Sequence, residues 1–211
     1  MVTILSEVNE PACNLAVSKA ACLLGAQTNV IVDKLMWEQD YNGRIFSAMS
    51  DVIFVSTGTH MCLFRFAQKS SVPVLCMKSR THATIQSLAT MMTMQVEPVS
   101  PLLYKQSEIM CSESQTCMKR CECIDEVLTD ANVIIAGPTT KRKEKTDVFR
   151  FTKQDAYKGT PDWIFFHCCP RGEEISDDLF CNYNARTFDA FENMPYITAA
   201  LMAKAVKGHV F

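Results

Sequence analysis

The sequence predicts an α/β protein with two lobes, each built on a parallel sheet flanked by helices. Its apolar runs are brief and do not alternate with polar residues, which is typical of parallel strands buried on both faces. Segments with apolar residues at helical spacing separate these runs, so strand and helix patterns alternate along the chain. Two prolines, Pro98 and Pro101, interrupt the chain near its middle and predict the boundary between the lobes.

The first half carries four strand-like and three helix-like segments. The predicted strands are residues 2–5, 28–32, 51–55 and 72–75. The predicted helices are residues 13–24, 61–68 and 83–95. Gly25 directly follows the first helical pattern and predicts its end. The many methionines of the third helix are typical of core filling. We therefore assign residues 1–97 to the first lobe.

The second half repeats the alternation. Strands are predicted at residues 132–136 and 163–168. Helices are predicted at residues 102–113, 124–128, 177–180 and 190–206. We assign residues 98–190 to the second lobe. We expect residues 191–211 to form a C-terminal helix that returns to the first lobe.

Composition and charge exclude several classes of protein. The net charge is −2, and the basic run at residues 141–145 is short and contains Glu144, which favours a solvated loop over a nucleic-acid site. No stretch approaches the ~18–20 apolar residues that a membrane span needs. The first residues match neither a secretory signal nor a mitochondrial presequence. The sequence as written therefore predicts a cytoplasmic protein, or a mitochondrial one if the true N-terminus is missing.

The eleven cysteines do not predict a disulfide framework or a metal site. Their number is odd, and the chain is neither short nor visibly secreted, so reduced thiols are expected. The cluster formed by Cys111, Cys117, Cys121 and Cys123 lacks the C-x2-C pairs of structural zinc sites. We therefore expect no bound metal.

Several segments, taken in order, resemble ornithine carbamoyltransferases. Residues 166–180, FHCCPRGEEISDDLF, resemble a family segment in which a strand ends in His-Cys-Leu-Pro before an acidic helix start. Residues 186–193, RTFDAFEN, resemble the family's Val-Phe-Asp-Glu-Ala-Glu-Asn-Arg run. Residues 51–56, 71–74 and 83–95 are similar to a strand, a Ser-Val-Pro-Val strand and a His-Pro-x-Gln helix. Because these matches are collinear along most of the chain, it is identified as a shortened, degenerate member of the family.

The resemblance implies the fold of aspartate and ornithine carbamoyltransferases. It implies a reaction in which the δ-amine of ornithine attacks carbamoyl phosphate, giving citrulline and phosphate, without a metal or organic cofactor. It also implies homotrimers with active sites at the subunit interfaces. Among the family's site positions, the chain keeps Gln86, His167 and Asn193 for substrate binding. Cys168 is kept as the catalytic thiol near the amine of ornithine.

Other positions depart from the family pattern. The phosphate loop, Ser-Thr-Arg-Thr-Arg at a helix start, aligns with residues 10–14, EPACN, so both arginines are absent. Glu10 would repel phosphate by about 4 kcal/mol at ~4 Å and an effective dielectric of about 20. His82 stands one position from the family histidine, roughly 100° around the predicted helix. The remaining replacements are Ser56 and Met194 for arginines, Ala83-Thr84 for His-Pro, and residues 137–143 for the ornithine-binding loop.

The chain is also shorter than the family pattern, so the resemblance implies that both lobes are truncated. Only residues 96–101 fill the place of a strand–helix–strand segment, and a helix and strand before the phosphate loop are missing. The neighbouring strands of the second lobe are therefore expected to lose ladder partners.

Three functions remain open. We favour a noncatalytic family member, in which Cys168 packs as a small apolar side chain and His167 hydrogen-bonds the backbone. An active transferase with a diverged site would need a substitute cationic pocket, for which the candidates are Arg65, Lys78, Arg80 and residues 141–145. The third possibility is a noncatalytic partner of intact carbamoyltransferase subunits, in a homo-oligomer or a mixed assembly.

Overall fold

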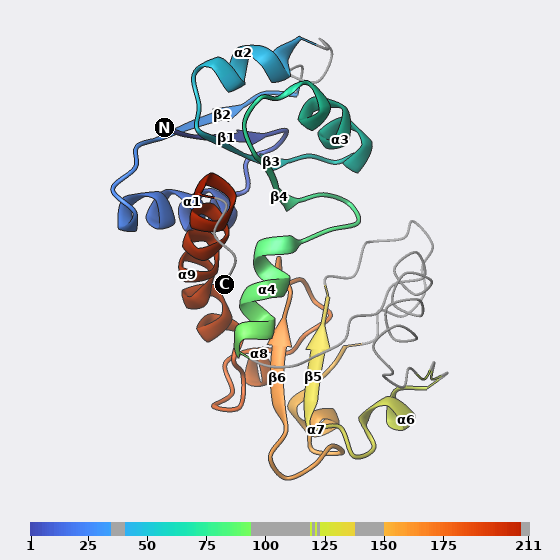
Figure 1. The fold of residues 1–211 in the computed structure, drawn as a ribbon. Coiled ribbons are helices and arrows are strands. Elements are labelled where there is room, and N and C mark those ends of the chain that lie inside the picture. The colour runs from blue at the N-terminus through green and yellow to red at the C-terminus, as the bar shows by residue number, and fades with distance from the viewer. Residues whose placement is uncertain (35–40, 94–118, 120, 122, 138–149, 208–211) are drawn as a thin grey trace. The chain divides into compact units, whose positions relative to one another are not determined.

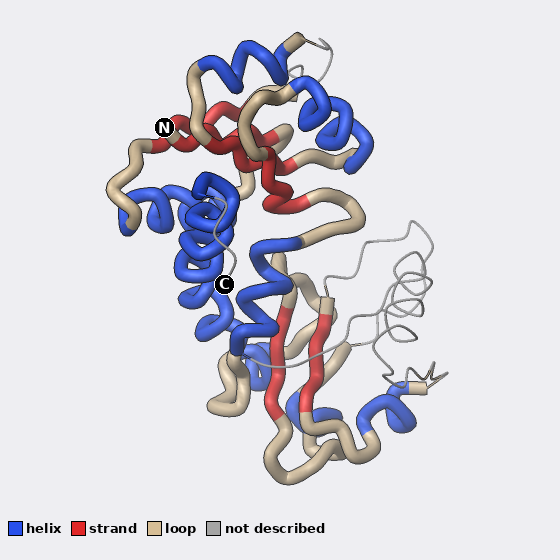
Figure 2. Tube along the Cα trace, in the orientation of Figure 1, coloured by secondary structure: helices blue, strands red, loops and turns tan. Residues whose placement is uncertain are grey.

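The computed structural model describes residues 1–34, 41–93, 119, 121, 123–137 and 150–207. The chain forms two compact units, Met1–Met92 with Phe191–Phe211, and Thr93–Ala190. Each unit carries parallel strands flanked by helices, which confirms the predicted α/β class (Figures 1 and 2). The predicted lobe boundary at residues 97–98 and the predicted helix at residues 102–113 lie outside the described residues.

The first unit is built on a four-stranded parallel sheet with the order β2-β1-β3-β4. Its strands are β1 (Val2–Ser6), β2 (Thr28–Val32), β3 (Val52–Ser56) and β4 (Val74–Lys78). Every residue of β1 and β3 is buried, as expected for central strands. The fourth strand begins two residues later than predicted, because Pro73 has no amide to donate; its carbonyl accepts a bond from the Ile53 amide.

Two helical layers cover the sheet of the first unit, as Figure 1 shows. The helices are α1 (Pro11–Leu23), α2 (Asn42–Ala48), α3 (His60–Lys69), α4 (Thr84–Thr93) and α9 (Thr187–Lys207). Ile4 and Phe54 pack on one face with residues of α1, α4 and α9. Leu5 and Ile53 point to the other face, toward α2 and α3. The unit is therefore a doubly wound sheet.

The helix α2 was not predicted, because its residues carry no helical apolar pattern. Packing against α3 explains its glycine. A Cβ atom added at Gly43 would lie 2.6 Å from the carbonyl oxygen of Phe66, closer than real Cβ contacts come. Only glycine therefore permits this approach of α2 to α3.

The C-terminal helix α9 contributes core residues to the first unit. Met194 and Met202 are buried in the cluster that contains Ile4 and Phe54. Pro195 lies inside the helix, where it lacks the amide that would continue the backbone ladder. The side chain of Thr198 donates a 2.7 Å hydrogen bond to the Met194 carbonyl. Apolar burial therefore holds α9 against the sheet despite its internal proline.

In the second unit, the described strands β5 (Val133–Ala136) and β6 (Ile164–His167) pair in parallel. The helices of this unit are α6 (Ile124–Leu128), α7 (Lys153–Ala156) and α8 (Asp177–Phe180). Trp163, Phe165 and Leu179 are buried in its core. The unpredicted α7 is a single turn that begins with a capping box between Thr152 and Asp155.

The strands of the second lobe were expected to lose ladder partners, but the edge of β6 away from β5 is partly paired. The amide of Phe165 donates to the Asn184 carbonyl at 3.0 Å, and the Arg186 amide donates to the Phe165 carbonyl at 2.8 Å. The segment before α9 therefore acts as a short additional strand against β6. Residues 184–186 therefore provide some of the backbone hydrogen bonds that the shortened lobe was expected to lack.

We expect the amides of β5 to exchange with solvent faster than those of β3. All four residues of β5 are half-buried, whereas β3 is fully buried and paired with strands on both sides. Hydrogen exchange read by mass spectrometry on peptides covering residues 132–136 and 51–55 measures both in one sample. Equal protection in a monodisperse monomer would contradict the prediction.

Candidate functional site

The strand order of the first unit brings two loops together at the carboxyl edge of its sheet. The chain leaves β1 toward β2 on one side and leaves β3 toward β4 on the other, so the order reverses between β1 and β3. Open α/β sheets bind ligands at such a switch point. Here Glu7 follows β1, Thr57 and Gly58 follow β3, and Lys78 ends β4. These residues form the candidate site of the first unit.

The carboxylate of Glu7 connects the two loops. It accepts a 2.6 Å hydrogen bond from the Gly58 amide and a 3.0 Å bond from the Thr57 hydroxyl. The amide of Glu7 itself donates to the Ser56 carbonyl at 2.9 Å. A single acidic residue therefore takes up the hydrogen-bond donors that face the switch point from the β3 loop.

Glu10 makes a second internal pair at the start of α1. Its Oε2 atom lies 3.0 Å from Nζ of Lys78, and both side chains are partly buried. The negative charge of Glu10 was expected to be uncompensated, but Lys78 pairs with it. The repulsion is offset by Lys78, but this cation, a candidate for a substitute anion pocket, is already engaged.

Cys13, also within the segment aligned with the phosphate loop, is buried. Its pKa is raised to about 11, mainly by burial and then by the nearby charge of Glu10. The side chain is therefore a neutral thiol near pH 7 and offers no strong donor for an anion. Ser56, aligned with a family arginine, is also buried, at the last position of β3.

His82 lies just before α4, which begins at Thr84, one residue later than predicted. Its ring stacks on that of His60, with centroids 4.2 Å apart. The pKa of His60 is lowered by burial and by the neighbouring imidazole of His82. Ser79 holds the pair: its hydroxyl contacts Nδ1 of His60 at 3.2 Å and accepts the His82 amide at 3.2 Å.

Gln86 and Asn193 lie in the first unit, on α4 and α9, and both are half-buried. Met194, aligned with a family arginine, is 2% exposed and belongs to the apolar core. A position that the resemblance assigns to an active-site cation is therefore a packing position here. His167 and Cys168 lie in the second unit.

His167 ends β6 and is held by three neighbours. Its amide donates to the Thr187 hydroxyl at 2.9 Å, and its Nδ1 accepts the Cys169 amide at 3.0 Å. Its Nε2 lies 3.1 Å from Oε1 of Glu174, although the two atoms are not aligned as a hydrogen bond. Glu174 therefore gives His167 an acidic neighbour that was not predicted from the sequence.

These contacts define the protonation state of His167. Because Nδ1 accepts a hydrogen bond, the neutral imidazole carries its proton on Nε2, the nitrogen nearer to Glu174. Burial lowers the pKa of His167, and the attraction of Glu174 opposes this shift only in part. The residue is therefore a neutral structural imidazole that ties its backbone to the following loop. The same carboxylate accepts the Gly172 amide at 2.8 Å.

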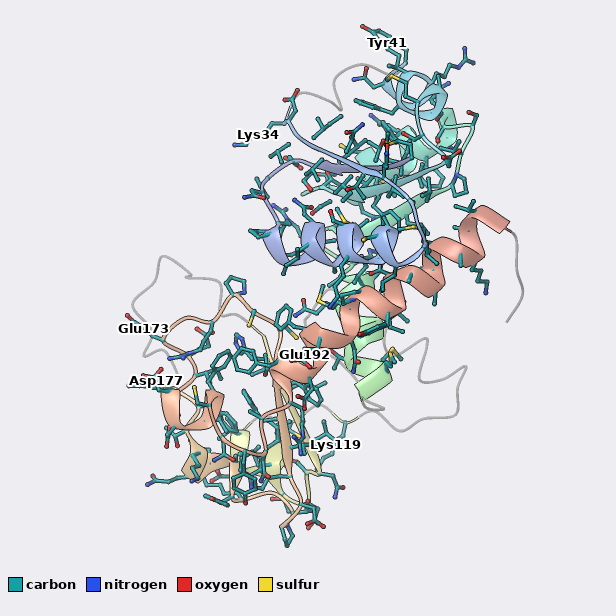
Figure 3. The ribbon with its side chains drawn as sticks, turned by 90° about the vertical axis from the view of Figure 1, so that its left-hand side faces the viewer. Lys34, Tyr41, Lys119, Glu173, Asp177 and Glu192 are labelled. Atoms are coloured by element: carbon teal, nitrogen blue, oxygen red, sulfur yellow. The ribbon has the colours of Figure 1, made fainter. Side chains whose placement is uncertain are left out.

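Cys168 is half-buried, and its amide donates to the Ala136 carbonyl at 2.9 Å. Burial raises the pKa of its thiol, and the adjacent Cys169 raises it further. Burial raises the pKa of Cys169 as well. Both side chains are therefore thiols near neutral pH, not activated thiolates. Figure 3 shows the acidic residues Glu173 and Asp177 on the loop and helix that follow.

Metal ligands do not gather in the described part of the chain, where no group of three His, Cys, Asp or Glu residues is placed to bind an ion. Cys111 and Cys117 of the cysteine cluster lie outside the described residues. So does most of the segment aligned with the ornithine-binding loop, residues 138–143. Among the residues described, no helix is long and apolar enough to cross a bilayer.

The fold is that of ornithine carbamoyltransferase structures. The chain superposes on the Pyrococcus furiosus enzyme with a TM-score of 0.86 and 19% identity, covering 100% of this chain and 85% of that one. For the Campylobacter jejuni enzyme the TM-score is 0.84 and the identity 20%, with coverage of 99% and 88%. These likenesses define the structural class.

Sequence comparison identifies the family. The family model "Aspartate/ornithine carbamoyltransferase, Asp/Orn binding domain" matches residues 72–205, and the chain belongs to this family. Ornithine carbamoyltransferase from Acinetobacter baumannii (strain AYE) is 25% identical over 206 residues, covering 76% of this chain and 67% of the relative. The protein of that name from Psychrobacter sp. (strain PRwf-1) is 23% identical over 214 residues, covering 80% and 70%.

Sequence reasoning missed Glu7, Thr57 and Glu174. Position offered a signal for the first two, because each lies two residues after a predicted buried strand, where parallel sheets place their ligand-binding loops. Glu174 lay within the quoted acidic stretch, but nothing in the sequence distinguished it from Glu173. Burial separates them, since Glu174 is 5% exposed whereas Glu173 is exposed.

We expect His167 to make stability depend on pH. Because its pKa is lowered in the folded state, the unfolded chain binds a proton more readily, and stability is lost as the pH falls below about 6.5. The urea concentration at the unfolding midpoint should therefore decrease between pH 7.5 and pH 5.5, and this decrease should be larger for the wild type than for His167→Gln. Equal decreases would show that His167 does not titrate differently on folding.

Replacing the thiol of Cys168 should affect stability and not ligand binding. Cys168→Ser places a hydroxyl in a partly apolar environment and should lower the free energy of unfolding by about 1–2 kcal/mol. Denaturant titration measures this, with Cys181→Ser as an exposed control. If Cys168→Ser instead abolished the binding of ornithine, the substrate-pocket interpretation would be correct.

Proposed function

We propose that the chain is a noncatalytic ornithine carbamoyltransferase-like protein. One observation carries the proposal: Glu7 and Glu10 occupy the carboxyl edge of the first sheet, with Thr57, Gly58 and Lys78 as their partners. The resemblance implies that the family binds carbamoyl phosphate at this edge with arginines. In this chain residues 7–14 contain neither arginine nor lysine.

The chemistry of carbamoyl transfer explains why this matters. The leaving phosphate carries two negative charges, so its departure requires cations and hydrogen-bond donors that face it before the reaction starts. Here the two donors after β3 bind a carboxylate, and the amine of Lys78 binds another. An incoming phosphate would meet two negative charges in place of a prepared cationic pocket.

The second unit supports the same conclusion. His167 is a buried neutral imidazole whose ring nitrogens face Cys169 and Glu174, so it is not directed at a substrate carbonyl. The pKa of Cys168 is raised by burial, which leaves no thiolate to contact an ammonium group. His167 and Cys168 therefore support packing and loop structure.

Assembly with other subunits is the second candidate function. Large apolar side chains are exposed on one face of the first unit, among them Ile45 on α2, Met49 directly after α2, and Met61 and Phe64 on α3. Such residues favour an interaction surface. Co-purification of a tagged chain with an intact ornithine carbamoyltransferase, followed by light scattering, tests this candidate, and a mixed oligomer would support it.

We expect the purified protein not to bind carbamoyl phosphate at millimolar concentration, because the donors and the cation at the sheet edge are already paired. Calorimetry, after a cooperative melt has been recorded, measures this, and an intact ornithine carbamoyltransferase is the positive control. A dissociation constant below about 100 μM, or about 5.5 kcal/mol of binding, would overturn the proposal. So would citrulline formation from carbamoyl phosphate and ornithine.

A further inference from the structure

The loop after β3 directs two hydrogen-bond donors at one point, and the Glu7 carboxylate from the loop after β1 occupies that point. We propose that the Gly58 amide and the Thr57 hydroxyl form a small-oxyanion site in which the Glu7 carboxylate is a built-in ligand. Removing this carboxylate, together with Glu10, opens the site to an external anion of the size of phosphate. The inference deepens the proposed function and rests on it, since it names the group that blocks the noncatalytic site and the class of ligand that this group excludes.

The hydrogen bonds show that both donors are directed at the carboxylate. The Gly58 amide lies 2.6 Å from Oε2 of Glu7, shorter than the usual ~2.9 Å for a neutral pair, as expected for a charged acceptor. The Thr57 hydroxyl accepts the Thr59 amide at 3.4 Å, so its own proton is free to point to Glu7 at 3.0 Å. Backbone amide and hydroxyl thus converge on one oxygen atom.

The site is rigid on its β3 side. Thr57 is 5% exposed, and its amide donates to the Lys78 carbonyl at 3.0 Å. Gly58 permits a close approach, because a Cβ atom there would lie only 3.3 Å from Oε2 of Glu7. Thr57 is therefore held by β4 independently of Glu7, and Gly58 follows it directly in the chain.

Lys78 would supply the positive charge of the opened site. It ends β4 beside the loop that carries Thr57, and its ammonium group pairs with Glu10 at 3.0 Å. While Glu10 is present, this charge is neutralised. A free anion must also compete with a carboxylate that the chain holds in place, which corresponds to an effective concentration on the order of millimolar or higher. Both carboxylates therefore need to be removed for an external oxyanion to bind.

The test uses inorganic phosphate as the probe and the full chain as the protein. Glu7→Ala with Glu10→Ala removes both carboxylates, and Glu7→Gln with Glu10→Gln is a second version that preserves side-chain volume. Glu173→Ala with Asp162→Ala is the control, because both residues are exposed and the change in net charge is the same. Thermal melts confirm folding, and calorimetry measures affinity.

A site-specific readout comes from the Gly58 amide. The chain contains seven glycines, so labelling glycine with ¹⁵N gives a simple amide spectrum. We expect phosphate to shift the Gly58 resonance in a folded double variant and to leave it unchanged in the wild type and in the charge control. Phosphate affinity should rise at least tenfold over the wild type. Adding Thr57→Val to the double variant should remove most of this gain.

The inference is overturned if a folded double variant binds phosphate no better than the charge control, or if the Gly58 amide does not respond. It is also overturned if binding survives Thr57→Val. These failures leave the proposed function intact as long as the wild type forms no citrulline. Citrulline formation by the wild type would instead overturn the proposed function, whatever the variants bind.

Discussion

The pairing of β1 with β3 is the constraint on which the rest of the first unit depends. The two strands are in register from Val2 opposite Val52 to Ser6 opposite Ser56, and each residue of both is buried. A slip of one residue would exchange the side chains of the two sheet faces and is therefore strongly disfavoured. The same register places Glu7 beside Thr57 and Gly58, so the internal carboxylate contact is a direct consequence of how the core packs.

Carboxylates that find partners within their own unit are a feature of both units. Glu10 pairs with Lys78, and Glu174 accepts the Gly172 amide while facing His167. A buried or partly buried charge is costly unless it is paired or hydrogen-bonded. Internal pairing therefore stabilises each site in its present form, and it also makes the same groups less available to a ligand.

The strands were predictable because their signal is local. Fully buried parallel strands such as β1 and β3 are short apolar runs, and the sequence shows them without any knowledge of their neighbours. The helix α2 was missed because its formation depends on a glycine contact with α3, and α7 was missed because one capping box defines its single turn. Tertiary packing and capping decide such elements more than apolar periodicity does.

The site was only partly predictable for a related reason. His167 and Cys168 were found because they stand in a contiguous motif, which a resemblance detects. Glu7 contacts residues 50 and 51 positions away, and this contact follows from strand register, which is not visible in one sequence. The contact between His167 and Glu174 was not predicted, because Glu174, seven residues later, reaches the imidazole only after the loop between them has folded back.

Retention of the fold and loss of the site's charges are compatible because they involve different kinds of residue. A TM-score of 0.86 at 19% identity shows that the fold requires little sequence identity once the alternation of strand and helix patterns is kept. Met194 illustrates the consequence. It stands where the family resemblance places an arginine, yet it is 2% exposed in the core beside Ile4 and Phe54. An arginine there would bury an unpaired charge, and the free-energy cost of burying such a charge is far larger than that of burying a methionine side chain. Restoring one site residue would thus conflict with the present packing, so recovery of a cationic pocket would require α9 and its neighbours to repack together.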